Sequence, residues 1–135
     1  MKYLKTLNSS SAPEVLALNI GSVNPSSPII ERGAVFTFDA SGRPQNSIAE
    51  GKPRYLALER WSDAKTPLKC MRIFEGMVFE AIPGSDPSSM HYGTVVSLTQ
   101  GENNCYVYCG DGETADAEVL YVDPYNDSYI IVTLL

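Results

Sequence analysis

The sequence predicts an all-β protein, a compact β-barrel or β-sandwich with an extended N-terminal arm, and three observations support this prediction. Apolar residues recur at period two or in short runs, which is the pattern of strands rather than of helices. Turn-forming residues interrupt these runs roughly every 8–12 residues, the spacing typical of sandwiches and barrels. Most of the nine prolines and ten glycines fall between the runs.

The apolar runs locate the individual strands, which are expected at residues 15–20, 34–38, 54–61, 68–74, 77–82, 94–98, 106–108, 118–122 and 128–135. No segment carries an amphipathic stripe long enough for a regular helix, although residues 47–50 or 62–65 could form a single turn. Pro67 and Pro83 stand just outside strand candidates, where they would discourage pairing between sheet edges.

The length of 135 residues is that of one ordinary domain, yet the first thirty residues differ from the rest. Ser-rich and Pro-rich stretches bracket a single apolar segment at residues 15–20. A segment of this kind has little core of its own and often becomes ordered only against a neighbour. The sequence therefore predicts an N-terminal arm over residues 1–30 and a β-rich body over residues 31–135.

The charged residues are unevenly distributed along the chain, whose formal net charge is −6. All ten Lys and Arg lie between Lys2 and Arg72, so residues 1–75 carry +3, whereas residues 76–135 contain nine carboxylates and no Lys or Arg. A half without basic residues is a poor partner for phosphate backbones, so we expect no nucleic-acid binding. Opposite charges of this kind can instead attract neighbouring copies or a charged protein scaffold.

The composition also bears on where the protein is found. The chain has no apolar run of membrane-spanning length, so no membrane association is expected, and residues 1–15 lack the apolar segment of a secretion signal. The three cysteines are Cys70, Cys105 and Cys109, an odd and sparse set that indicates reduced core thiols rather than a disulfide framework. Synthesis and residence in a reducing compartment are therefore expected.

Two acidic stretches are candidates for cation binding. The DASG stretch at residues 39–42 follows the alternating run VFTF, and Asp39 with Gly42 is typical of a turn between strands. The GDGETAD stretch at residues 110–116 gathers three carboxylates without the spacing of a helix-loop-helix calcium site. We interpret both as solvated turns, and we expect neither a metal nor another cofactor.

The sequence offers little for catalysis. His91 is the one histidine, in the stretch SSMHYG, and neither a GxSxG elbow nor a phosphate-binding glycine loop is present. Ser88, Ser89 and His91 share one short loop, and closeness in sequence does not create the geometry of a catalytic triad. A small hydrolase or lyase using His91 and Asp86 is an alternative, but no catalytic residues are assigned and no enzyme is expected.

Aromatic side chains remain as candidates for binding a sugar or a protein partner, because their rings combine a large apolar face with a polar edge. The candidates are Trp61, Tyr92, Tyr106, Tyr108, Tyr121, Tyr125 and Tyr129. Burial in the core accounts for most of them, and Trp61 is the one we expect at an interface.

An arm followed by a small β body without catalytic residues resembles the small decoration, or cement, proteins of tailed bacteriophage heads. The stretches that carry the resemblance are IERGAVFTFDASGRPQNSIAEGKPRYLALER, with its short hairpin and following strand, and CMRIFEGMVFEAIP, with a kink at Gly76. The resemblance covers residues 28–98. It implies many copies on the outer capsid surface of the virion, made in the host cytoplasm, often trimeric around local threefold positions and bound to the major capsid protein.

This resemblance suggests which residues make contacts with the capsid or between subunits. They are expected in the arm and in the basic half, namely Lys2, Lys5, Val15, Leu16, Leu18, Ile20, Arg32, Arg43 and Trp61. The alternative from another class is a carbohydrate- or receptor-binding β module of a phage fibre or tail, which would use Trp61 and exposed tyrosines.

Overall fold

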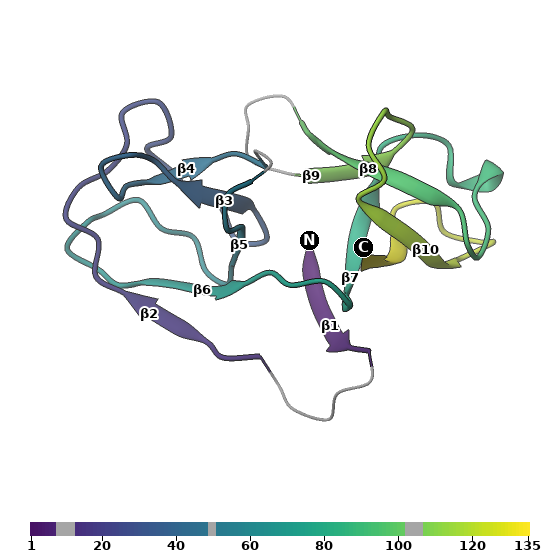
Figure 1. Cartoon of the computed structure of the whole chain (residues 1–135), viewed down its shortest axis with the longest axis horizontal. Helices are drawn as coiled ribbons and strands as arrows, with labels where there is room; N and C mark the ends of the chain where they lie inside the picture. The colour runs from purple at the N-terminus through teal and green to yellow at the C-terminus, as the bar shows by residue number, and fades with distance from the viewer. Residues whose placement is uncertain (8–12, 49–50, 102–106) are drawn as a thin grey trace. The chain divides into compact units, whose positions relative to one another are not determined.

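A computed structural model of the chain describes residues 1–7, 13–48, 51–101 and 107–135, and it confirms the predicted all-β class (Figure 1). The only helical element in these residues is one turn of 3-10 helix, η1 (Pro87–Ser89). The strands are β1 (Lys2–Thr6), β2 (Leu16–Leu18), β3 (Val35–Phe38), β4 (Pro44–Asn46), β5 (Tyr55–Ala57), β6 (Leu68–Arg72), β7 (Met77–Pro83), β8 (Val95–Gln100), β9 (Val107–Gly110), β10 (Ala117–Val122) and β11 (Ile130–Leu134).

Each segment predicted as a strand overlaps an observed one, and the strands found in this way are β2, β3 and β5 to β11. β1 and β4 were not predicted. β1 has the sequence KYLKT, in which two lysines obscure the alternation, and β4 begins with Pro44 and continues with two amides. Proline and lysine are both typical of strands at the edge of a sheet, and β1 and β4 are the end strands of their sheets.

The chain forms two compact units, which differ from the predicted arm and body. Unit 1 consists of Met1–Ala12, Phe74–Thr99 and Val107–Leu135, and unit 2 consists of Pro13–Ile73 and Gln100–Tyr106. Residues 1–30 are therefore shared between the units instead of forming one extended arm. The physical reason is backbone pairing, since β1 is hydrogen-bonded to β7 and β2 to β6, each in an antiparallel ladder.

Unit 1 is built on a closed barrel with the strand order β7-β11-β10-β8-β9, and β9 returns to pair with β7. The closing pair is parallel and short, joining Ile82 to Tyr108 and Pro83 to Cys109, while β1 pairs with the first part of β7. Side chains that alternate along the strands fill the interior. Phe79, Val132 and Val119 lie opposite one another on three successive strands and are fully buried.

Two glycines allow the barrel to close. The Gly84 N–H donates to the Cys109 carbonyl at 2.8 Å, directly after the parallel pair. A Cβ on Gly110 would lie 2.9 Å from the Gly84 carbonyl carbon and 3.0 Å from the Ser85 nitrogen, so the two backbones come too close for a side chain there. The end of β7 and the end of β9 can therefore meet only because position 110 is glycine.

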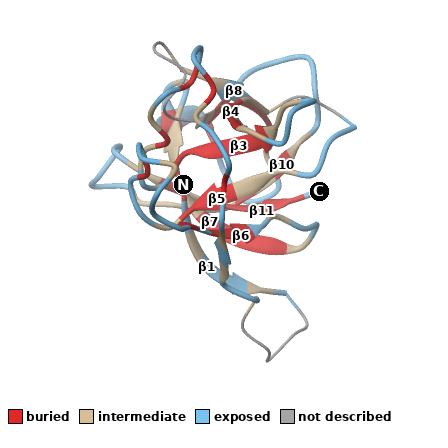
Figure 2. Ribbon diagram, turned by 90° about the vertical axis from the view of Figure 1, so that its left-hand side faces the viewer, coloured by how far each residue is buried: buried red, intermediate tan, exposed pale blue. Residues whose placement is uncertain are grey.

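Unit 2 is an open sheet with the strand order β2-β6-β5-β3-β4. Its core gathers Ile20, Ile30, Ala34, Phe36, Ala57, Trp61, Leu68 and Cys70, with Leu16, Leu18, Phe38 and Tyr55 packed against them. Figure 2 shows the buried residues of both units concentrated on the strands, with β3, β6, β7 and β11 coloured mainly red. A bridge between Ile30 and Trp61 ties the chain that follows β2 into this core.

Candidate binding surfaces

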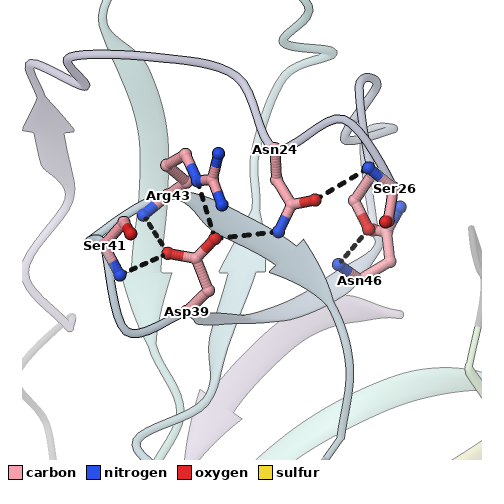
Figure 3. A network of polar contacts seen from close by, with 7 residues as sticks. Asn24, Ser26, Asp39, Ser41, Arg43 and Asn46 are labelled. Atoms are coloured by element: carbon pink, nitrogen blue, oxygen red, sulfur yellow. Dashed lines mark hydrogen bonds and ion pairs between the residues drawn. The ribbon is translucent and has the colours of Figure 1, made fainter.

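The acidic corner at residues 39–43 is a turn whose carboxylate is fully occupied by the protein (Figure 3). Asp39 Oδ1 accepts hydrogen bonds from the Ser41 and Arg43 backbone N–H groups at 2.8 and 2.9 Å. Its Oδ2 accepts from Arg43 Nε at 2.8 Å and from Asn24 Nδ2 at 2.9 Å. The corner is therefore a turn, as the sequence predicted, and it fixes the hairpin of β3 and β4. Each oxygen of its carboxylate already accepts two hydrogen bonds.

The hydrogen bonds hold the pKa of the Asp39 carboxyl below its ordinary value. The backbone N–H of Arg43 is the largest cause, the guanidinium of Arg43 and the Ser41 N–H add to it, and partial desolvation opposes them. Asp39 is thus the charged acceptor that the turn requires. Arg43 is half-buried and forms an ion pair with this carboxylate. Its guanidinium therefore stabilises the hairpin, whether or not it also contacts another molecule.

The residues predicted to contact the capsid or another subunit lie in two different environments. Lys2, Lys5, Val15 and Arg32 are exposed, Leu16, Leu18 and Arg43 are half-buried, and Ile20 and Trp61 are buried. Lys2 and Lys5 are on β1 of unit 1, whereas the others belong to unit 2. The structure brings Leu16, Leu18, Ile20 and Trp61 together in the core of unit 2 rather than on a surface.

Trp61, which the sequence suggested for an interface, is a core residue of unit 2. Its side chain is 2% exposed, and its indole Nε1 donates to the Thr66 carbonyl at 2.9 Å. The hydrogen bond explains how a tryptophan can be buried here without an unsatisfied donor. A sugar-binding or receptor-binding surface would therefore have to be built without the Trp61 ring.

The loop around His91 holds itself together and does not form a triad. Asp86 caps η1 by accepting from the Ser88 N–H at 2.9 Å, and the Ser89 hydroxyl donates to the Asp86 carbonyl at 2.8 Å. His91 Nδ1 lies 3.0 Å from the carbonyl oxygen of Tyr92, its own neighbour. In the part of the chain that the structure describes, no hydrogen bond joins His91 to Ser88, Ser89 or Asp86.

The GDGETAD stretch is also an internally bonded turn. Asp116 Oδ2 accepts from the Leu98 N–H at 2.9 Å and from the Thr114 hydroxyl at 2.5 Å. The Ser97 hydroxyl donates to the Thr114 carbonyl, and the Thr114 N–H donates back to Ser97 Oγ at 3.1 Å. Asp116 and Ser97 thus lock the turn onto β8. Within the described ranges, no three His, Cys, Asp or Glu side chains are grouped to hold a metal ion.

Two of the cysteines are buried free thiols, as predicted, and Cys105 lies outside the described residues. Burial raises the pKa of the Cys70 thiol to about 11. Burial likewise raises the pKa of the Cys109 thiol to about 12. A nucleophilic or metal-binding cysteine requires the thiolate, so neither residue is prepared for such chemistry at neutral pH.

An apolar hollow on unit 2 was missed in the sequence. It encloses about 390 Å³ and is lined by Phe38, Asp39, Ala40, Lys52, Pro53 and Tyr55. The Phe38 and Tyr55 rings meet edge to face with centroids 5.2 Å apart, and both pack on the buried ring of Phe36. We call this feature the Phe38 hollow. Tyr55 pairs across the strands with Phe36, which makes Phe38 its diagonal neighbour, so no local sequence pattern indicates the hollow.

A second candidate surface lies on unit 1, around the loop that joins β10 to β11. Asp123 Oδ1 accepts from the Tyr125 N–H at 2.9 Å, and its Oδ2 accepts from the Tyr129 hydroxyl at 3.1 Å. Tyr125, one of the aromatic candidates, is 96% exposed at the tip of this loop. The loop and the η1 region line a hollow of about 590 Å³ whose acidic residues are Asp86, Asp123 and Asp127.

Charge separates by folding unit. Unit 1 contains two lysines, both on β1, against nine carboxylates, which gives −7, whereas unit 2 contains eight Lys and Arg against seven Asp and Glu, which gives +1. The asymmetry seen along the sequence is therefore a difference between an acidic barrel and a nearly neutral sheet. Over residues 1–7, 13–48, 51–101 and 107–135, no helix is both long and apolar enough to cross a membrane.

Comparison with known proteins found no matching family model, no similar curated protein and no similar solved structure.

Proposed function

We propose that this chain is a structural decoration protein of a tailed-phage head, which binds the outer capsid surface and stabilises it by bridging capsid subunits. Its partners are the major capsid protein and further copies of itself, with a trimer as the favoured assembly. It works by binding and performs no reaction. The sequence resemblance of residues 28–98 to this class suggests the role, and the physical properties of the two units support it.

The observation that carries the proposal is the separation of charge between the two units. One unit of the chain is an acidic barrel at −7 and the other is a sheet at +1, so the two units have different electrostatic preferences. Complementary potentials orient a protein on a charged scaffold and suppress wrong partners. On a symmetric shell the same modest contact is repeated many times, so weak individual binding sums to high avidity.

Arg32 is the residue of unit 2 that best fits a direct contact with the shell. It is exposed, in the turn before β3, and its guanidinium has no ion pair within the described ranges. The neighbouring Glu31 pairs instead with Arg60 at 3.4 Å. Arg43 is a poorer probe than Arg32, because replacing it would also disturb the hydrogen bonds of Asp39.

The proposal is tested by binding the purified protein to undecorated heads of the phage that encodes it and measuring co-sedimentation. Arg32→Glu should lower the affinity for heads several-fold, whereas Lys65→Glu, an exposed change of the same charge in the same unit, should lower it less. Wild-type protein that does not sediment with heads at any concentration would overturn the proposed function. Equal binding of the two variants to heads would show that Arg32 does not contact the capsid.

A further inference from the structure

The loop that carries Tyr125 presents an uncovered aromatic ring on a fixed backbone. The Tyr125 N–H is held by Asp123 Oδ1, and the Ser128 N–H is held by Asn126 Oδ1 at 3.0 Å. Pro124, which restricts its own backbone angle, precedes the tyrosine. Because these bonds order the loop in advance, docking the ring costs little conformational entropy, which is the property of strong interface residues.

The Phe38 hollow is a recess, whereas Tyr125 is an exposed ring. Its floor is made by the Phe38 and Tyr55 rings and Pro53, and the packing of both rings on Phe36 fixes their positions. Neither the Lys52 ammonium nor the Tyr55 hydroxyl has a hydrogen-bond partner among the residues that the structure describes. Asp39 at the rim is already paired with Arg43. The hollow therefore offers an apolar floor beside one unpaired cation.

The Tyr125 loop and the Phe38 hollow also carry opposite charges. Asp127 lies two residues beyond Tyr125, and in the described part of the chain its carboxylate accepts no hydrogen bond and joins no ion pair. An aromatic ring followed by a free carboxylate is what a hollow with an apolar floor and a free ammonium would receive. The wider surroundings agree, since Tyr125 belongs to the unit at −7 and Lys52 to the unit at +1.

We propose that Tyr125 of one copy inserts into the Phe38 hollow of a second copy, with Asp127 of the first pairing with Lys52 of the second. The occupant is a second copy because this one chain carries both complementary halves. Each copy then contributes one Tyr125 side chain and one Phe38 hollow, so the contact is head-to-tail. Such contacts form a closed cyclic oligomer when the rotation between copies closes. The inference rests on the self-association part of the proposed function and not on binding to a capsid.

The test is the oligomeric state in solution, measured by light scattering during size exclusion over a range of protein concentrations. Tyr125→Ser and Lys52→Glu should each weaken self-association at least about tenfold. The matched controls are Tyr92→Ser, another exposed tyrosine of unit 1, and Lys65→Glu, another exposed lysine of unit 2. Both controls should assemble like wild type, and all four substituted side chains are exposed, so the variants should remain folded.

Mixing the two variants tests the head-to-tail geometry. Tyr125→Ser keeps an intact hollow and Lys52→Glu keeps an intact ring, so an equimolar mixture should form pairs and no larger ring. Wild type that stays monomeric up to about 0.1 mM, or variants that assemble as wild type does, would overturn the inference. If Tyr125→Ser still assembles but loses binding to heads, the ring contacts the capsid instead, and the proposed function survives while this inference fails.

Discussion

At the scale of single residues, the hydrogen bonds that Asp39 accepts make the DASG corner a turn. The short spacing between the aspartate, the serine N–H and the arginine N–H made a turn predictable from the sequence. The contribution of Asn24 was not predictable, because this residue lies 15 positions earlier in the chain and reaches the carboxylate through the fold of unit 2. Local hydrogen bonds can be anticipated from spacing, whereas long-range ones depend on the tertiary structure.

The lowered pKa of Asp39 predicts how the stability of unit 2 depends on pH. A carboxyl whose folded pKa is below its unfolded value stabilises the fold above the unfolded pKa, and this contribution is lost as the pH falls through the folded pKa. Asp39→Asn should therefore lower the unfolding temperature at pH 7, and the difference from wild type should shrink steadily below about pH 4. Thermal unfolding followed by circular dichroism measures both.

Asp111→Asn is the control for this prediction. Asp111 is exposed, and its carboxylate accepts no hydrogen bond within the described ranges, so the change should leave the unfolding temperature almost unaltered. A difference between Asp39→Asn and wild type that stayed constant from pH 7 to pH 3 would show that the charge of Asp39 does not stabilise the corner.

At the scale of strands, periodicity located most elements but not their partners. The apolar run at residues 77–82 predicted β7, yet nothing in it indicates that its end pairs in parallel with Tyr108 and Cys109. The parallel pair closes the barrel, and it depends on a close backbone approach at Gly84 and Gly110. The sequence could therefore predict a barrel or a sandwich, but it could not distinguish between them.

Gly110→Ala should destabilise unit 1 by about 1–3 kcal/mol, because the added Cβ would press on the backbone of Gly84 and Ser85. Gly21→Ala is the matched control, since a Cβ there meets nothing within 4 Å. Denaturant unfolding of the two variants and the wild type measures the difference in free energy. A Gly110→Ala protein as stable as Gly21→Ala would contradict the close approach of β7 and β9.

The strand β1 gives a second prediction at this scale. The sequence suggested that residues 1–30 form an arm outside the β-rich body. In the structure Tyr3 lies edge to face on Phe79 with ring centroids 5.9 Å apart, and β1 covers the edge of β7. Removing residues 1–7 should therefore lower the unfolding temperature and promote aggregation through the uncovered strand edge.

The shortened chain is compared with a Lys2→Ser, Lys5→Ser double variant, which removes the same charges and retains the strand. Thermal unfolding and light scattering should separate the two, with the double variant close to wild type. A shortened chain that unfolds at the wild-type temperature and stays in solution would show that residues 1–7 are indeed a dispensable arm.

At the scale of the whole molecule, the uneven charge along the sequence corresponds to a difference in net charge between the two folding units. The division of the chain at residue 76 by charge nearly coincides with the start of the main part of unit 1 at Phe74. The contribution of β1 to that unit could not be foreseen, because the residues that pair with it are more than 70 positions away. The contrast between an acidic and a nearly neutral unit is the feature on which the proposed function depends.

The most direct test of the proposed function is electron cryo-microscopy of the tailed-phage heads to which it assigns this chain, imaged with and without saturating protein. The account predicts additional density on the outer surface, repeated with the symmetry of the shell and grouped in threes at local threefold positions. Heads whose outer surface is the same in the two samples would contradict it.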